Sequence, residues 1–124
     1  MAEDAVPERV RDFVLRNIDS VAQLEALLLL RREPNTGWDP RALADRLYIS
    51  VQQALEVLIA LKDRHLVTVS DGLYRYECSV GVREIIDNLA TIYSRQLIQV
   101  TNLVHSKPSG VQAFAEAFKL RKDT

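Results

Sequence analysis

The sequence predicts a mainly α fold with a small β-hairpin, and three observations carry this prediction. Apolar residues recur at helical spacing through most of the 124 residues. Two short runs, 66–70 and 73–77, flank Asp71-Gly72, a pair that fits a two-residue type I′ turn. Helices joined by a tight turn precede this hairpin, so the expected architecture is a winged helix-turn-helix core plus a long C-terminal helix and a short terminal helix.

The chain divides into three predicted parts. Residues 1–18 hold an N-terminal helix, with Pro7 in its first turn. Residues 19–78 form the winged helix-turn-helix domain, and residues 79–124 form C-terminal helices for dimerisation and packing. Four apolar residues give the first helix one buried face: Val10, Phe13, Val14 and Ile18. Because this helix is short and amphipathic, it needs a partner surface, which is either its own domain or a second copy.

The next helix is the most apolar of the chain. Asp19-Ser20 offers a cap for its start, and it ends near Arg32 because Pro34 disfavours helix in the residue before it. The pair Arg31-Arg32 is interpreted as charge that favours the helix C-terminus, with contact to a polyanion as the alternative. Trp38 follows the turn-rich loop 34–37, and we expect it to pack in the core or on the hairpin rather than to stack on a ligand; a winged-helix fold, to which the resemblance given below points, implies a very short strand at this position.

A helix-turn-helix follows. Asp39 is a good N-cap and Pro40 suits the first helical position, so the first of its two helices runs to about Leu47. Ser50 caps the second helix, which spans roughly 51–64. Helical spacing gives this second helix one buried face, made by Ala54, Leu58 and Leu61, with Val51 and Leu55 beside it.

This stretch resembles the winged-helix domains of bacterial transcriptional regulators, broadly the MarR-type and PadR-type groups. The resemblance lies in Leu43-Ala44-Asp45-Arg46-Leu47, Ile49-Ser50, Leu58 to Leu61, His65-Leu66-Val67 and the Asp71-Gly72 wing. It covers roughly a third of the chain and implies a role in gene regulation, with helix 51–64 as a recognition helix for the major groove. Tyr48 and His65 depart from the pattern, because glycine is frequent at both positions.

The outer side of helix 51–64 lacks the charge expected of a DNA reader. Six residues lie opposite its buried row: Gln52, Gln53, Glu56, Ile59, Ala60 and Asp63. None is basic, and carboxylates that face a duplex oppose phosphate attraction. The sequence therefore predicts a non-enzymatic regulatory module that binds a protein through this surface as a dimer, with plain solvated helix as the alternative for the two glutamines.

Two other functions are alternatives. In a DNA-binding transcriptional regulator, Gln52 and Gln53 would read adenine edges. Five basic residues would then contact phosphates: Arg41, Arg46, Lys62, Arg64 and Arg75. In a small-molecule-sensing regulator, an apolar pocket would lie between the C-terminal helix and the core, near Trp38 or Tyr93. No effector is identified by the sequence.

Beyond the hairpin, Ser79 is expected to cap one continuous helix that reaches about His105. Seven apolar residues form a stripe on it: Val82, Ile86, Leu89, Tyr93, Leu97, Val100 and Val104. Such a helix is about 35–40 Å long, more than a small three-helix core can cover. A homodimer through this stripe is predicted, with burial against the first and last helices as the alternative. A final short helix, capped by Ser109, is expected to carry Phe114 and Phe118 on one face.

Composition argues against several classes of protein. The net charge is −1, so no global field favours nucleic acid or an acidic membrane. One cysteine and two histidines offer no zinc spacing, no glycine-rich phosphate loop is present, and no nucleophile–base pair can be argued. We therefore expect no enzyme, no catalytic or metal site and no cofactor. The acidic start of the chain lacks an apolar run, which predicts a cytoplasmic protein without a signal peptide or membrane contact.

Overall fold

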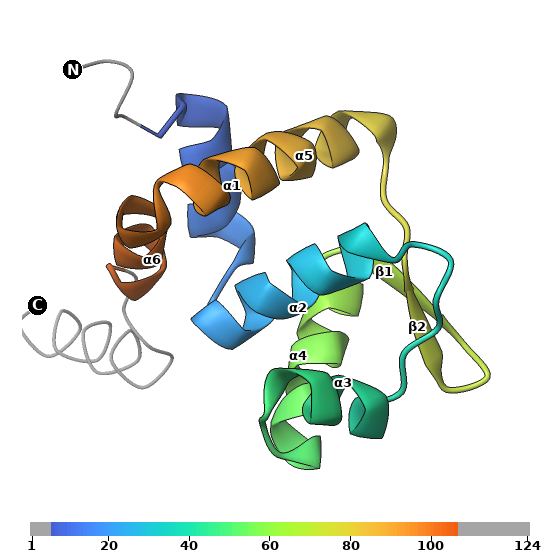
Figure 1. The fold of residues 1–124 in the computed structure, drawn as a ribbon. Coiled ribbons are helices and arrows are strands. Elements are labelled where there is room, and N and C mark those ends of the chain that lie inside the picture. The colour runs from blue at the N-terminus through green and yellow to red at the C-terminus, as the bar shows by residue number, and fades with distance from the viewer. Residues whose placement is uncertain (1–5, 107–124) are drawn as a thin grey trace, which may run out of the picture.

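The computed structural model describes residues 6–106 and shows a mainly α fold with one small antiparallel hairpin, as predicted (Figure 1). Its elements in chain order are α1 (Glu8–Asn17), α2 (Val21–Arg32), α3 (Pro40–Leu47), α4 (Val51–Asp63), β1 (Val67–Ser70), β2 (Leu73–Tyr76), α5 (Val80–Arg95) and α6 (Leu97–His105). Within 6–106, no helix has the length and apolarity needed to span a bilayer.

Side-chain caps begin four of these helices at the positions that the sequence indicated. In each, a side-chain oxygen accepts a hydrogen bond from a backbone N–H of the first turn, which otherwise has no partner in the helix. The cap residues are Ser20, Asp39, Ser50 and Ser79. The starts of α2, α3, α4 and α5 are therefore local properties of the chain.

The core lies among α2, α3 and α4, which pack against one another beside the hairpin (Figure 1). The helix α4 buries the row predicted for it, with Ala54, Leu58 and Leu61 fully covered. Val57 adds to the same face. Fully buried leucines of α2 and α3 meet this row: Leu24, Leu27, Leu30 and Leu43. Helical periodicity thus selected the correct buried side of α4.

The hairpin has the predicted turn. Asp71 and Gly72 both have positive φ, 53° and 77°, as a type I′ turn requires. The strands β1 and β2 pair from Ser70↔Leu73 to Val67↔Tyr76. Trp38 forms a bridge to Tyr74, with N–H···O distances of 2.9 and 2.8 Å in the two directions. The expected short strand at Trp38 is therefore present, and its ring is buried.

Two residues without the freedom of glycine adopt the left-handed conformation at helix ends. Tyr48, which follows α3, has φ 57°, and His65, shortly after α4, has φ 62°. These are the two positions at which the sequence departs from the glycine of the resembled pattern. For a non-glycine residue this conformation costs on the order of 1–2 kcal/mol.

The single long helix expected over 79–105 was wrong. The helix α5 ends at Arg95 and α6 begins at Leu97, because Gln96 between them has φ −128° and ψ 54°. The helix α6 turns away from the axis of α5, and α1 packs against both (Figure 1). No proline or glycine stands at the break, and the apolar spacing of the sequence continues across it. For this reason the sequence predicted one continuous helix. The helix predicted after Ser109 lies outside the described residues.

Candidate functional site

The outer side of α4 is exposed as the helical wheel predicted. Five of the six candidate residues are exposed and Ala60 is half-buried; the exposed ones are Gln52, Gln53, Glu56, Ile59 and Asp63. Glu56 and Asp63 therefore present their carboxylates to any partner of this helix. Lys62 is the basic residue of α4 itself, and it is exposed beside this row.

Both glutamines of this surface have partners within α4. The Ser50 backbone N–H donates to Oε1 of Gln53 at 3.0 Å, and the Gln53 N–H donates to Ser50 Oγ at 3.0 Å, which is a complete capping box. Nε2 of Gln52 donates to Glu56 Oε2 at 3.1 Å. An adenine edge needs both the donor and the acceptor of an amide, so base reading would disrupt these bonds.

The candidate phosphate contacts do not gather beside α4. Arg64 turns toward the α1–α2 junction, where it donates to the Arg16 carbonyl oxygen at 2.7 Å and to Asp19 Oδ2 at 3.0 Å. Arg41 and Lys62 are exposed, and neither makes an ion pair with another described residue. Arg64 is therefore a structural residue that connects α4 to the preceding helices.

Arg46 and Arg75 also have contacts within the chain. Arg46 lies 5.3 Å from the centroid of the Trp38 ring and 3.3 Å from Glu33 Oε2. The guanidinium of Arg75 lies so close to Gly37 that a methyl group there would meet it at 2.9 Å. Two of the five expected phosphate contacts are thus in ion pairs, and a third packs against the loop before α3.

Sequence reasoning missed two apolar residues at the start of α4. The side chain of Tyr48 is 94% exposed and Val51 is 47% exposed, although Val51 was expected beside the buried row. Val51 is the first residue of α4, one residue after the cap, where the surrounding elements cover it only in part. Tyr48 and Val51, together with Ile59, which is 42% exposed, add apolar surface to the exposed part of α4 and the turn before it. We call Tyr48, Val51, Gln52, Glu56, Ile59 and Asp63 the α4 surface.

The stripe expected to form a homodimer is largely covered by the chain itself. Four of its seven residues are buried: Ile86, Leu89, Val100 and Val104. Val82 and Tyr93 are half-buried, and Leu97 is 53% exposed. Because α1 packs on both α5 and α6, this apolar face does not need a second copy to cover it. Burial against the first helix, the alternative to a dimer, thus accounts for most of the stripe, and its use as a dimer surface stays a prediction.

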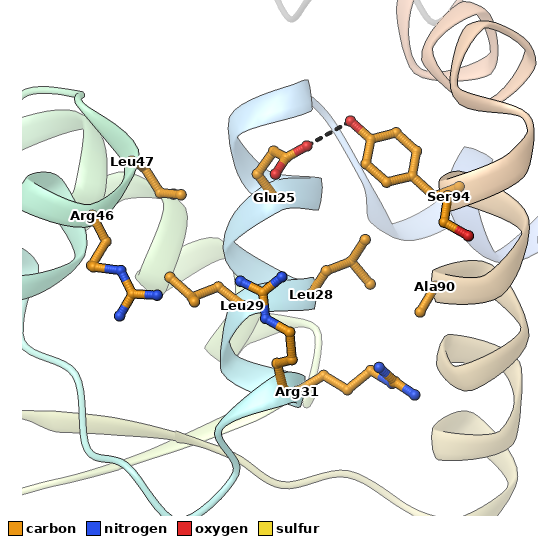
Figure 2. A pocket seen from close by; sticks show the side chains of 10 residues that line it. Glu25, Leu28, Leu29, Arg31, Arg46, Leu47, Ala90 and Ser94 are labelled. Carbon is orange, nitrogen blue, oxygen red and sulfur yellow. Dashed lines mark hydrogen bonds between the residues drawn. The ribbon is translucent and has the colours of Figure 1, made fainter.

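An open cleft of about 440 Å³ lies between α2, α3 and α5 (Figure 2). Its lining combines apolar and charged side chains: Glu25, Leu28, Leu29, Arg31, Arg32, Arg46, Leu47, Ala90, Tyr93 and Ser94. The small-molecule-sensing alternative expected an apolar pocket near Trp38 or Tyr93. Tyr93 does line the observed cleft, but three arginines also line it, so the cleft is not the apolar pocket that was expected.

A short hydrogen bond spans this cleft at one end. The Tyr93 hydroxyl donates to Glu25 Oε2 at 2.6 Å, between α5 and α2 (Figure 2). Burial, and then the hydrogen bond to the Glu25 carboxylate, raise the pKa of Tyr93 to about 12. Because the phenol stays protonated well above neutral pH, it serves as a donor to Glu25 and not as a base.

No catalytic or metal-binding arrangement stands out in the described part of the chain. Within 6–106, no three His, Cys, Asp or Glu side chains lie close enough to hold a metal ion. Cys78, a free half-buried thiol, follows β2. Comparison of the chain with family models, with curated proteins and with solved structures finds no match.

Proposed function

We propose that this protein is a non-enzymatic winged-helix module of the cytoplasm that binds another protein through the α4 surface. Three packed helices, a following hairpin and a single-residue strand at Trp38 that pairs with Tyr74 support the winged-helix interpretation. The absence of a basic face on α4 supports a protein partner over DNA. The proposal depends most on one residue, Tyr48.

Tyr48 combines backbone strain with nearly complete exposure. Its φ of 57° is a conformation that glycine adopts without strain, and its ring is 94% exposed. The exposed ring buries almost no surface, so its packing does not offset the free-energy cost of the left-handed backbone at this residue. Strained residues of this kind gather at functional sites, and tyrosine is enriched among the residues that carry protein–protein binding energy.

The chemistry of the α4 surface specifies its partner. Val51, at the start of α4, and Ile59, about two turns further along the helix, supply exposed apolar area in addition to Tyr48. Glu56 and Asp63 add negative charge on the same side of the helix. The complementary partner is a protein segment with apolar side chains flanked by lysine or arginine, since like charges across an interface oppose binding.

Site-specific photo-crosslinking tests this proposal. A photo-reactive phenylalanine in place of Ile59 should form one main adduct in cells, whose cross-linked peptide contains basic and apolar residues. The same group in place of Asn88, which is exposed on α5, is the matched control. Adding Tyr48→Gly, a change that should not unfold the chain, should remove the Ile59 adduct. Equal adducts from both positions, or an adduct that survives Tyr48→Gly, would refute the proposal.

Duplex binding distinguishes the first alternative. Fluorescence anisotropy with a random-sequence duplex at about 50 mM salt should show no micromolar binding. Binding that weakens steeply with added salt would instead support a DNA-binding regulator. In that case Arg75→Ala should weaken binding evenly across sequences, whereas Gln53→Ala should alter site preference.

The homodimer stays a prediction, and within the stripe only the residues that are not buried, Val82, Tyr93 and Leu97, are available for contact with a second copy. Light scattering after size exclusion tests it directly. A particle near the chain mass of 14.1 kDa at high protein concentration would exclude it.

A further inference from the structure

A hollow of about 310 Å³ lies between the first turn of α2 and one side of α4. Its lining combines small, amide and acidic side chains: Asp19, Ser20, Ala22, Gln23, Gln53, Glu56, Val57 and Ala60. The four residues that α4 contributes are spaced at i, i+3, i+4 and i+7, so they share one face of that helix. We call this space the α2–α4 hollow. It adjoins the α4 surface, because Glu56 belongs to both.

The apolar part of the hollow consists of small side chains. Ala22 of α2 and Ala60 of α4 are half-buried, and Val57 is buried beside them in the lining. Alanine fills little volume, so the packing of α2 on α4 leaves space here that a larger side chain would have closed. This apolar part can therefore cover the methylene chain of a long side chain from another protein.

The two amide side chains of the lining are held by bonds within the chain. Gln23 is buried; its Nε2 donates to the Asn17 carbonyl oxygen at 2.7 Å, and its Oε1 accepts from the Asp19 N–H at 2.9 Å. Gln53 is fixed by its capping box with Ser50. Because these groups are already ordered, little conformational entropy is lost when a side chain enters the hollow.

Glu56 carries the unmatched charge of the hollow. The other carboxylate of the lining, Asp19, forms an ion pair with Arg64, and Arg64 is not itself part of the lining. Glu56 accepts a hydrogen bond from Gln52 at 3.1 Å and forms no ion pair with another residue of 6–106. None of the described residues that line the hollow is basic. A cationic group is therefore the electrostatic complement of this space.

We propose that the α2–α4 hollow takes one arginine side chain of the protein that binds the α4 surface. The methylene stem of this arginine lies over Ala22 and Ala60, and its guanidinium donates to the Glu56 carboxylate, whose oxygens accept more than one hydrogen bond each. Arginine fits better than lysine because its planar group pairs with a carboxylate through two bonds and is more weakly hydrated. This inference rests on the function proposed above, and it narrows the basic partner segment to one that contains an arginine anchor.

A matched pair of small probes tests the charge requirement in the full chain. Nα-acetyl-arginine amide carries the guanidinium, whereas Nα-acetyl-citrulline amide has a neutral urea of nearly the same shape. In NMR titrations the arginine probe should shift the amide signals of residues 20–23 and 56–60. It should bind about fivefold more tightly than the citrulline probe, which cannot form the ion pair. Equal binding of the two probes, or shifts confined to residues outside the hollow, would overturn the proposal.

Three variants test the location. Glu56→Gln should weaken binding of the arginine probe about fivefold, because it removes the charge of the hollow. Glu84→Gln makes the same change at an exposed residue of α5 outside the hollow, and it should leave the affinity unchanged. Ala22→Leu keeps every charge but fills part of the space, so it should also weaken binding. Melting temperatures check that each variant is folded. Equal losses from the two glutamate variants would mean that the probe responds to net charge alone, which would overturn the site.

The photo-crosslink at Ile59 separates this inference from the proposed function. We expect the arginine probe to bind selectively and Glu56→Gln to weaken the Ile59 adduct in cells. An Ile59 adduct combined with equal binding of the two probes would keep the α4 surface and exclude the arginine anchor. Selective arginine binding without an Ile59 adduct would keep the hollow as an arginine site and refute only the proposal for the α4 surface.

Discussion

The guanidinium of Arg64 donates to the Asp19 carboxylate and to the Arg16 carbonyl oxygen, and so connects the end of α4 to the junction between α1 and α2. These contacts join residues 45 and 48 positions apart in the chain. A side chain that only the DNA-binding alternative assigned to phosphate is therefore part of the intramolecular structure. Replacing Arg64 should therefore lower the stability of the fold, whether or not the protein binds DNA.

Arg64→Met should lower the free energy of unfolding by about 1–2 kcal/mol. An exposed ion pair contributes about 0–1 kcal/mol, and the hydrogen bond to a backbone carbonyl adds about 1 kcal/mol. Lys62→Met, two residues earlier and without an ion pair among the described residues, should change stability by less than about 0.5 kcal/mol. Urea denaturation measures both, and equal effects would contradict the structural role of Arg64.

Gln53→Ala should lower the free energy of unfolding by about 1 kcal/mol, because it removes the side-chain half of the capping box with Ser50. Gln52→Ala is the matched control, since among residues 6–106 the Gln52 side chain bonds another side chain, that of Glu56, and no backbone group. It should cost less than about 0.5 kcal/mol. A larger loss from the Gln52 change would mean that the capping box does not stabilise the start of α4.

The same change at two glycines should have opposite effects. Gly72→Ala should destabilise the protein by about 1 kcal/mol, because φ there is 77° while the space around it is open. Gly81→Ala lies in the first turn of α5, also in open space, and should stabilise by about 0.5 kcal/mol. Thermal unfolding measures both signs. A stabilising Gly72 change would rule out the left-handed turn.

Tyr48→Gly should raise the free energy of unfolding by about 0.5 kcal/mol, because it relieves the left-handed strain and loses almost no packing. Tyr48→Ala removes the same ring but keeps the strained backbone, so it should give no gain. If both changes destabilise the protein equally, the ring contributes to folding and Tyr48 loses its special place in the proposed interface.

Tyr93→Phe should cost about 1 kcal/mol at neutral pH, through the lost bond to Glu25. Because the pKa of Tyr93 is raised from 10.0 to about 12, this contribution is complete below pH 10 and is lost as the pH rises toward 12. The stability difference between the wild-type protein and the variant should therefore shrink over that interval. Burial raises the pKa of Tyr76 as well, but this contribution is common to both proteins and cancels.

Phenolate absorbance provides the matching spectroscopic test. The difference between the two proteins should show one phenol that titrates near pH 12. Glu25→Gln keeps a hydrogen-bond acceptor but removes the charge, so it should move the pKa of Tyr93 part of the way back toward 10. A Tyr93 phenol that titrates at its ordinary pKa in the wild-type protein would show that the cleft is open at this end.

Local signals in the sequence determined most of the elements. The cap residues, the turn pair Asp71-Gly72 and the spacing of Leu58 and Leu61 each act within a few residues, so the starts of α2 to α5, the hairpin and the buried side of α4 could be predicted. The acidic, exposed character of Glu56 could be predicted for the same reason. Tyr48 carried a signal as well, since it occupies a position where glycine is frequent.

Only the tertiary structure decided how α1, α5 and α6 pack and which charged side chains form ion pairs. The break at Gln96 lets Val100 and Val104 be buried beside α1, although the apolar period continues through it. The pairing of Arg64 with Asp19, and the cleft that joins Arg31 to Tyr93, depend on residues tens of positions apart. Periodicity reports which face of a helix is apolar, but which element covers that face is set by long-range packing.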